Sequence, residues 1–238
     1  MNKNDNVPAD EVTIPDPFAY VEGKRVDRMA HTTEERLQEI QKEFSEGFEF
    51  IKKYDRSVSI FGSARATPAS PHWQKAYSIA QRIVKELGYA IVTGGGHGIM
   101  EAGNKGALDA GGVSIGLNIT LPHEQTRNHY LSNSMEFYYF FCRKVILSFS
   151  AEAYLFFPGG FGTLDEFFEL VTLIETRKIP ALPLILIGDD FWKPLQTYIE
   201  EHLYGEHRAI DKKDMNLYHI TENEDEILEI IKKATAKA

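Results

Sequence analysis

The chain has 238 residues and a net charge of −9, so it can bury a substantial core in one large domain or two small ones. Its basic residues are scattered and form no run, which disfavours a nucleic-acid partner. The single cysteine, Cys142, excludes an intrachain disulfide and a thiolate-rich metal site, and it is typical of a reducing compartment. No apolar run reaches the length of a membrane span and the first residues lack a signal-peptide core, so we expect a cytoplasmic protein without a membrane partner.

The amino-terminal part differs from the rest of the chain. Residues 1 to 30 are polar and interrupted by prolines, which indicates an arm that lies over the surface or is partly disordered. Residues 31–54 show helical periodicity, and Thr33 can cap the start of this helix. We therefore expect an amino-terminal arm and helix over residues 1–54, followed by one domain over residues 55–238.

From residue 57 onward, apolar runs alternate with helical patterns. Strands are expected at residues 57–63, 89–95, 113–119, 153–160 and 182–188. Helices are expected at residues 71–88, 98–111, 163–178 and 191–205. Residues 120–134 resemble a long loop, residues 135–150 a strand that passes into a helix, and residues 217–238 a short strand and a helix. Continuous apolar strands are covered on both faces, so the pattern predicts an α/β fold with a doubly wound parallel sheet flanked by helices.

The loops at the carboxyl ends of the strands are where such a sheet binds ligands. Two of them are rich in glycine, at residues 93–98 and 158–163. Successive glycines let backbone N–H groups converge, and the following helix adds the positive end of its dipole, so each loop is suited to a phosphate group. The alternative is that these glycines only form tight turns.

Other phosphate and metal sites find little support. No Gly-Lys-Ser/Thr follows either loop, so a P-loop triphosphatase is excluded. The glycines after residue 93 lack the G-x-G-x-x-G spacing, and no acid ends the strand at 113–119, so we expect no dinucleotide cofactor. His97, His123 and His129 lie on loops without a recognised ligand spacing, so we expect no metal.

Two charged residues are candidates for chemistry beside the glycine loops. Glu166 lies in the first turn of the expected helix, where its carboxylate can reach a sugar or a water near a bound phosphate. It also follows Thr163 by three residues, so a capping box is the structural alternative. Arg143 lies in an otherwise apolar stretch and can bind an anion, although Arg143 and Lys144 can equally face water on an amphipathic helix.

Three segments together give the sequence a family resemblance: "GGGHGIMEAGNKGA", the pair Arg143-Lys144 and "PGGFGTLDE". They resemble the LOG ("Lonely guy") family, whose signature P-G-G-x-G-T-x-x-E is matched by residues 158–166 at every fixed position. The similarity covers roughly residues 56–235. It implies a Rossmann-like homodimer that hydrolyses the N-glycosidic bond of a nucleoside 5′-monophosphate, a cytokinin riboside 5′-monophosphate or an AMP-like nucleotide, to the free base and ribose 5-phosphate. Members are often labelled lysine decarboxylases, but the sequence shows no context for a pyridoxal-binding lysine.

The resemblance also implies residue roles. Arg143 and Glu166 are the implied catalytic residues. Candidates for holding the phosphate and ribose are loop glycines and hydroxyl residues: Gly62, Ser63, Gly95, Gly96, Gly159, Gly160, Gly162 and Thr163. Further candidates are Lys144, Asn118, Glu124 and Met100. Plant-type members carry the run Met-His-x-Arg-Lys. In this chain, Phe140 and Phe141 stand at the Met and His positions of that run, so the residues that shape the base pocket differ.

A second function class stays open at this point. A non-catalytic binder or carrier of a phosphorylated small molecule, such as a nucleotide or a molybdopterin-type cofactor, would keep the glycine loops. It would need neither Arg143 nor Glu166. The presence of both residues favours the enzyme.

Overall fold

The computed structural model describes residues 32–120 and 127–235, and the expected arm over residues 1–30 lies outside them. The chain divides into two compact units, residues 1–39 and residues 40–238. Helix α1 (Thr33–Ile51) is capped by Thr32, not by Thr33 as we expected. The Thr32 hydroxyl accepts from the backbone N–H of Glu35 at 3.2 Å, and the Glu35 carboxylate accepts from that of Thr32 at 2.7 Å, which is a capping box. The division between residues 54 and 55 stays a prediction.

Seven strands form one sheet in the order β4-β3-β2-β1-β5-β6-β7, and every neighbouring pair is parallel. The strands are β1 (Ser57–Phe61), β2 (Ala90–Thr93), β3 (Ser114–Ile119), β4 (Asn133–Phe137), β5 (Ala153–Phe156), β6 (Leu184–Leu186) and β7 (His219–Ile220). In the middle of the sheet, Ser59 of β1 lies opposite Val92 of β2 on one side and Tyr154 of β5 on the other. The predicted doubly wound parallel sheet is confirmed.

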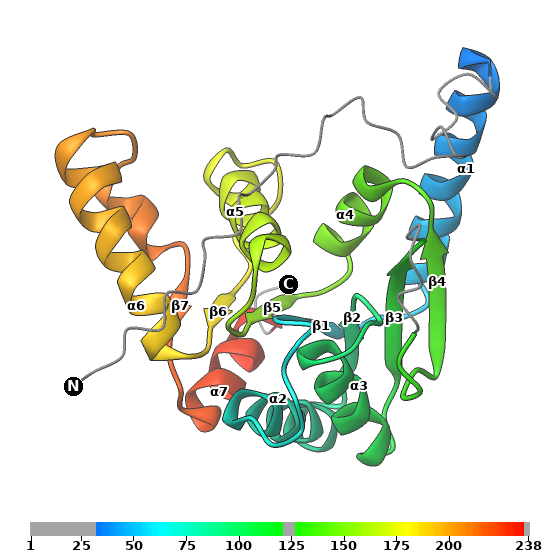
Figure 1. Cartoon of the computed structure of the whole chain (residues 1–238), viewed down its shortest axis with the longest axis horizontal. Helices are drawn as coiled ribbons and strands as arrows, with labels where there is room; N and C mark the ends of the chain where they lie inside the picture. Colours follow the sequence, from blue (N-terminus) through cyan, green and yellow to red (C-terminus); the bar gives the residue numbers. More distant parts are fainter. Residues whose placement is uncertain (1–31, 121–126, 236–238) are drawn as a thin grey trace, which may run out of the picture. The chain divides into compact units, whose positions relative to one another are not determined.

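Helices cover both faces of the sheet (Figure 1). α2, α3 and α7 pack on one face and α4, α5 and α6 on the other. Their bounds are α2 (Pro71–Arg82), α3 (Ile99–Asp109), α4 (Phe140–Ser148), α5 (Phe161–Glu175), α6 (Asp189–Tyr198) and α7 (Glu224–Thr235). Shorter helical turns are η1 (Ile83–Leu87), η2 (Ile199–Glu206) and η3 (Lys212–Asn216). Successive residues of β1 pack in opposite cores, Ile60 with α2 and α3 and Phe61 with the α5 side, which is why this strand is buried along its whole length.

Two boundaries differ from the sequence-based expectation. β4 begins at Asn133, inside the expected loop. The sequence did not indicate this start, because β4 is an edge strand that keeps several side chains near solvent and therefore lacks an apolar run. α5 begins at Phe161, two residues earlier than expected. Gly160, in an extended conformation with φ −92° and ψ −160°, ends the preceding loop, and its carbonyl accepts from the N–H groups of Thr163 and Leu164.

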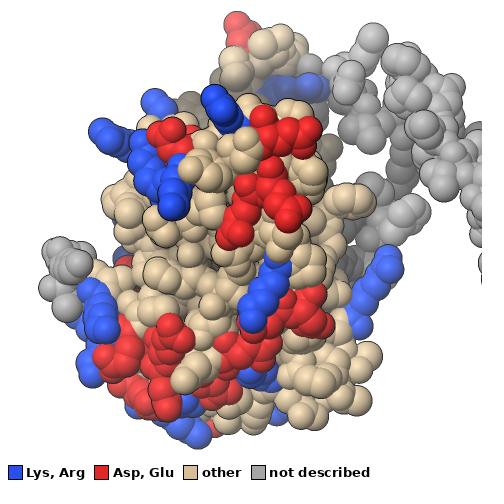
Figure 2. All heavy atoms as spheres, turned by 90° about the vertical axis from the view of Figure 1, so that its left-hand side faces the viewer, with Lys and Arg blue, Asp and Glu red and all other residues tan. Residues whose placement is uncertain are grey.

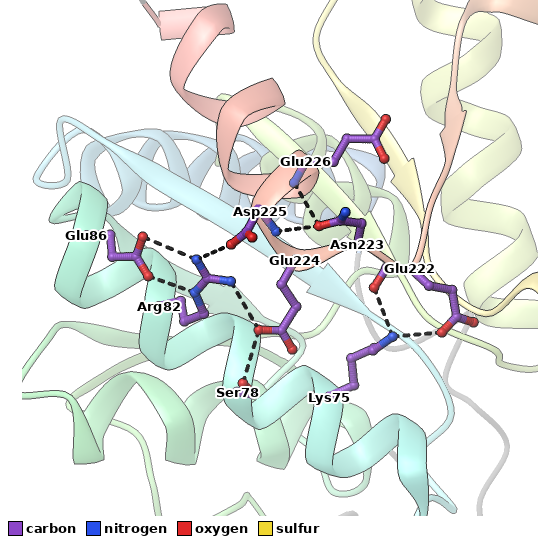
Figure 3. A network of polar contacts seen from close by, with 9 residues as sticks. All are labelled: Lys75, Ser78, Arg82, Glu86, Glu222, Asn223, Glu224, Asp225 and Glu226. Carbon is purple, nitrogen blue, oxygen red and sulfur yellow. Dashed lines mark hydrogen bonds and ion pairs between the residues drawn. The ribbon is translucent and has the colours of Figure 1, made fainter.

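A polar network fastens the start of α7 to α2 (Figure 3). The Arg82 guanidinium pairs with Glu86 and Asp225 at 2.7 Å each and with Glu224 at 3.4 Å. Asn223 caps α7 by accepting from the N–H of Asp225 at 2.9 Å. Each exposed ion pair of this kind contributes little to the stability of the fold. We therefore infer that the network serves mainly to orient α7, whose apolar side packs in the core.

Figure 2 shows the side of α6 and α7, where Asp and Glu gather in clusters and Lys and Arg lie beside them. On the described part of this face, Lys and Arg side chains are interspersed with acidic ones and form no continuous basic patch. None of the described helices is both long and apolar enough to cross a membrane.

Candidate active site

The order of the strands places a crevice next to the centre of the sheet. From β1 the chain moves outward through β2 and β3 to β4, and it then returns to β5 on the other side of β1. At such a switch point, the loops that follow the two central strands separate and leave room for a ligand. An open cavity of about 890 Å³ lies there. It is lined from the loops after β1 and β5 and from helices α4 and α5.

Backbone contacts hold the loops of this cavity together. The N–H of Ser63 donates to the carbonyl of Pro158 at 3.0 Å, and the N–H of Ile99 donates to the carbonyl of Ser63 at 3.0 Å. Gly98 has φ +70°, and a Cβ at this position would lie 2.2 Å from the Ser63 carbonyl oxygen, so only glycine fits. The loop after β1 is therefore fixed between the two glycine-rich loops.

The motif glycines surround the amino end of α5. A Cβ on Gly159 would lie 2.1 Å from Thr163 Oγ1, whereas Gly160 and Gly162 have no atom within 4 Å of an added Cβ. Gly159 thus lets the Thr163 hydroxyl approach the backbone, and the other two leave the first turn of the helix open. The first N–H groups of a helix have no intrahelical acceptor, and the helix dipole favours negative charge beside them. The arrangement suits a phosphate group.

Glu166 faces the cavity from α5. Its residue is 8% exposed, and its Oε2 has no hydrogen-bond partner among the described residues. Burial raises the pKa of Glu166 to about 7, opposed mainly by the positive charge of Lys144 and then by that of Arg143. The capping box with Thr163 is not formed, because Gly160 is the N-cap of α5 and Thr163 already lies inside the helix. The carboxylate is therefore not used in capping.

Arg143 reaches the same cavity from α4. Its Nε donates to the carbonyl of Leu117 at 2.7 Å, and its guanidinium lies so close to Gly94 that a Cβ there would be 2.3 Å from Nη2. Burial lowers the pKa of Arg143, and the charge of Glu166 opposes this shift. The alternative of a water-facing arginine on an outer helix surface is therefore wrong.

Lys144 links the two helices beside these groups. Its Nζ pairs with Asp165 at 2.5 Å and with Glu169 at 3.1 Å, both on α5. Burial acts to lower the pKa of Lys144, but the neighbouring carboxylates outweigh it and the pKa is raised. Lys144 therefore stays charged and offsets the negative charges of Asp165 and Glu169 on α5.

Most of the other candidates also line the cavity. Its lining includes Gly62, Ser63, Met100, Gly159, Gly160, Gly162 and Thr163. Gly95, Gly96 and Asn118 are not part of that lining, although Gly94 is. Glu124 lies outside the described residues. Within the described residues, no group of three or more His, Cys, Asp and Glu side chains is placed to hold a metal ion.

Gly95 and Gly96 take part in a buried network behind the cavity. The N–H of Gly95 donates to the Thr93 hydroxyl at 2.9 Å. Asn128 donates from its side chain to the Gly96 carbonyl at 2.8 Å and from its backbone to the Gly95 carbonyl at 3.0 Å. Asn118 packs against Gly95, and its buried Oδ1 has no hydrogen-bond partner in the described part of the chain. The network fixes the shape of this loop.

Arg65 and Phe161 line the cavity beside the motif glycines, although neither was named as a candidate from the sequence. Arg65 follows the first strand, so its position in a loop next to the switch point was an available signal. Phe161 occupies the variable position of the motif and is 92% exposed, which a glycine-rich flank does not reveal.

The family comparison agrees with this site. The sequence model of the family described as "possible lysine decarboxylase" matches residues 100–231, which is more than half of the chain. The chain belongs to the LOG family. A relative of this LOG-family chain, the cytokinin riboside 5′-monophosphate phosphoribohydrolase of Rhodococcoides fascians, is 27% identical over 151 residues, which are 61% of this chain and 74% of that protein.

Solved structures show the same fold. The molybdenum cofactor binding protein of Rippkaea orientalis matches with a TM-score of 0.55 and 22% identity, over 75% of this chain and 95% of that one. The molybdenum cofactor carrier protein of Chlamydomonas reinhardtii matches with a TM-score of 0.56 and 20% identity, over 76% and 98%. At these identities, the similarity establishes that the LOG-family chain shares their Rossmann-like architecture.

Proposed function

We propose that this protein hydrolyses the N-glycosidic bond of a nucleoside 5′-monophosphate and releases the free base and ribose 5-phosphate. The observation that carries the proposal is the buried Glu166 carboxylate, whose Oε2 is unpaired, in the cavity that also contains Arg143 and the open amino end of α5. The name of the Rhodococcoides fascians relative supports the same reaction class.

The phosphate would bind at the first turn of α5. No atom lies within 4 Å of a Cβ built on Gly160 or Gly162, so this turn is open on the cavity side, and the hydroxyl of Thr163 adds a donor. Arg65 and Lys144 add positive charge around the same cavity. Anchoring one end of the substrate in this way fixes the position of the ribose, so the reacting bond is oriented without further chemistry.

The reaction would then take place beside Glu166. As the bond between C1′ and the base nitrogen lengthens, its electron pair leaves with the base and positive charge develops on the sugar. The oxygen of a water molecule bonds to C1′, and one proton of that water is transferred to the base. Ionised Glu166 stabilises the charge on the sugar or orients the water, and Arg143 offsets negative charge on the leaving base or holds the phosphate side.

The base would lie toward the aromatic side of the cavity, which is lined by Phe140 and Phe161. Both side chains are exposed, at 54% and 92%, so a flat ring can stack on them. The proposal covers AMP-like nucleotides and cytokinin riboside monophosphates alike.

A carrier of a phosphorylated small molecule is the second candidate. The fold shared with the two molybdenum cofactor proteins and the open cavity of about 890 Å³ favour it. A carrier has no use for a buried, unpaired carboxylate, which costs free energy in the folded state. The enzyme therefore accounts for one more feature of the site.

We further propose that the protein is a cytoplasmic homodimer that pairs through its aromatic surface. Several aromatic side chains are exposed on α4, on α5 and at the residues that flank α4: Tyr138, Phe141, Phe149 and Phe168. Exposed apolar and aromatic side chains are enriched at protein interaction sites. Sedimentation equilibrium of the wild type and of a Tyr138→Ser variant tests this, since Tyr138 is 61% exposed and the variant should shift toward monomer; a monomeric wild type would contradict the proposal.

Product analysis tests the proposed reaction. The full chain is incubated with a panel of nucleoside 5′-monophosphates, including AMP and a cytokinin riboside monophosphate, and the mixtures are separated by chromatography. We expect free base and ribose 5-phosphate in equal amounts from at least one nucleotide, and no release from the matching nucleoside without phosphate at the same concentration. Binding of nucleotides without any product would favour the carrier.

A further inference from the structure

The start of α4 is capped by a residue from a distant part of the chain. Its N-cap, Tyr139, makes no side-chain capping bond. Instead, the carboxylate of Glu43 on α1 accepts from the backbone N–H groups of Tyr138 at 2.6 Å and Tyr139 at 3.2 Å. A carboxylate at this end also complements the dipole of α4. The same carboxylate lies close to the buried thiol of Cys142, whose pKa is raised to about 11 by burial and then by Glu43.

Residues 40–51 of α1 extend this contact along α4. A Cβ on Gly47 would lie 2.6 Å from Ile146 Cγ1, so the glycine lets the two helices approach closely. Aromatic rings meet on either side of it, with Phe44 and Phe141 at 6.3 Å between centroids and Phe48 and Phe149 at 5.8 Å. Position 47 is one turn after position 43 and position 48 one turn after position 44, so the four residues form a single stripe on α1. The capped end of α4 is thus packed as well as hydrogen-bonded.

Arg143 follows directly from this capped end. Its backbone N–H donates to the carbonyl of Tyr139 at 3.1 Å, which is a hydrogen bond of the first helical turn. Its Nε donates to Leu117 on the other side, which directs the guanidinium into the cavity. Tyr139 is therefore held by Glu43 through its N–H and holds Arg143 through its carbonyl.

We infer that Glu43 is a positioning residue for Arg143, and that residues 40–51 of α1 set the arginine in the cavity; the inference rests on the proposed function of that cavity. This segment precedes residues 100–231, which the family model matches, and also the 56–235 region of the resemblance. The contact between α1 and α4 therefore belongs to the amino-terminal extension of this chain. Glu43 touches no substrate and acts through α4.

Two variants of the full chain and a matched control test the inference. Glu43→Ala removes both capping bonds, and Glu43→Gln keeps an acceptor for one of them. Glu46→Ala is the control, because Glu46 lies one turn further on α1 with its side chain 56% exposed and meets Lys42 only at 3.8 Å. Urea unfolding identifies conditions under which all variants are folded, and Glu43→Gln supplies the data if Glu43→Ala does not fold.

The first measurement does not depend on activity. The Nε–H resonance of Arg143 is assigned by its loss in Arg143→Lys, and its hydrogen exchange is followed in ¹⁵N-labelled protein. We expect exchange at least about tenfold faster in Glu43→Ala, a smaller increase in Glu43→Gln and no change in Glu46→Ala. Unchanged exchange in Glu43→Ala would overturn the inference, even if the protein proves to cleave no nucleotide.

The second measurement is a double-mutant cycle on kcat with the nucleotide that the product analysis identifies. We expect Glu43→Ala to lower kcat by about tenfold in the wild type and to have no further effect in an Arg143→Ala background. Glu46→Ala should leave kcat unchanged in both. An equal loss in the two backgrounds would mean that Glu43 acts on the fold in general and would contradict the positioning role.

Discussion

Arg143 and Glu166 line the same cavity from helices α4 and α5, and the charge of each favours the ionised form of the other. Burial acts more strongly than this pairing, because it lowers the pKa of Arg143 and raises that of Glu166 to about 7. Glu166 is therefore poised near neutral pH, where a carboxyl group can both hold and release a proton. Buried ionisable groups with shifted pKa values are typical of functional sites.

The first prediction concerns stability against pH. Glu166 ordinarily titrates near 4.5 and does so near 7 in the folded chain, so the native state binds more protons between these values and the wild type loses stability as pH rises through them. Glu166→Gln does not titrate, so it should become more stable than the wild type across that range, by at most about 3 kcal/mol at about pH 8. Urea unfolding between about pH 4 and pH 8 measures the difference. A difference in unfolding free energy that stays the same at every pH would contradict a buried Glu166 carboxyl group that takes up its proton near pH 7.

The second prediction concerns Lys144, the largest of the influences that lower the pKa of Glu166. Lys144→Met removes this charge, so the pKa of Glu166 should rise further. The ascending limb of kcat/KM against pH, which reports ionisation of Glu166 in the free enzyme, should then move to higher pH.

Lys105→Met is the matched control for this profile. Lys105 pairs with Asp109 on α3 and is not part of the cavity lining, so its removal should leave the limb in place. The same limb in Lys144→Met and the wild type would mean that Lys144 does not set the charge of Glu166.

The third prediction separates two neighbouring glycines. Gly159→Ala forces a Cβ to within 2.1 Å of Thr163 Oγ1, whereas Gly160→Ala meets no atom within 4 Å and keeps a negative φ. We expect Gly159→Ala to lower the free energy of unfolding by about 1–3 kcal/mol through overpacking. Gly160→Ala should leave that free energy unchanged or raise it by up to about 1 kcal/mol through the unfolded state. Denaturant titration of both variants measures this, and equal losses would show that the turn is not packed as described.

The core of the fold could be predicted from the sequence because burial on both faces leaves a direct pattern. β1, β2, β3 and β5 are mostly apolar and buried along their whole length, and the helix after β1 starts with Ser70 as its cap and Pro71 as its first residue. β4 could not be located as well, because its edge position places polar residues in it. Helix starts were also displaced where a neighbouring residue capped instead, as with Thr32 and Gly160.

The residues of the candidate site could be predicted from the sequence, but their burial and hydrogen bonding could not. Motif positions identify Arg143 and Glu166, and both line the cavity. Whether Glu166 is used in capping or left unpaired depends on where α5 begins, which differs by only two residues between the alternatives. The contact between Glu43 and the start of α4 joins residues about a hundred positions apart, and no local pattern indicates it.

We propose that Glu166 acts in bond cleavage and not in substrate binding. The most direct measurement compares the wild type and Glu166→Gln with the same nucleoside 5′-monophosphate, recording base release and, by calorimetry, the Kd. We predict that Glu166→Gln binds the nucleotide within about tenfold of the wild type and releases base at least about a thousandfold more slowly. Base release by Glu166→Gln at close to the wild-type rate would contradict the account.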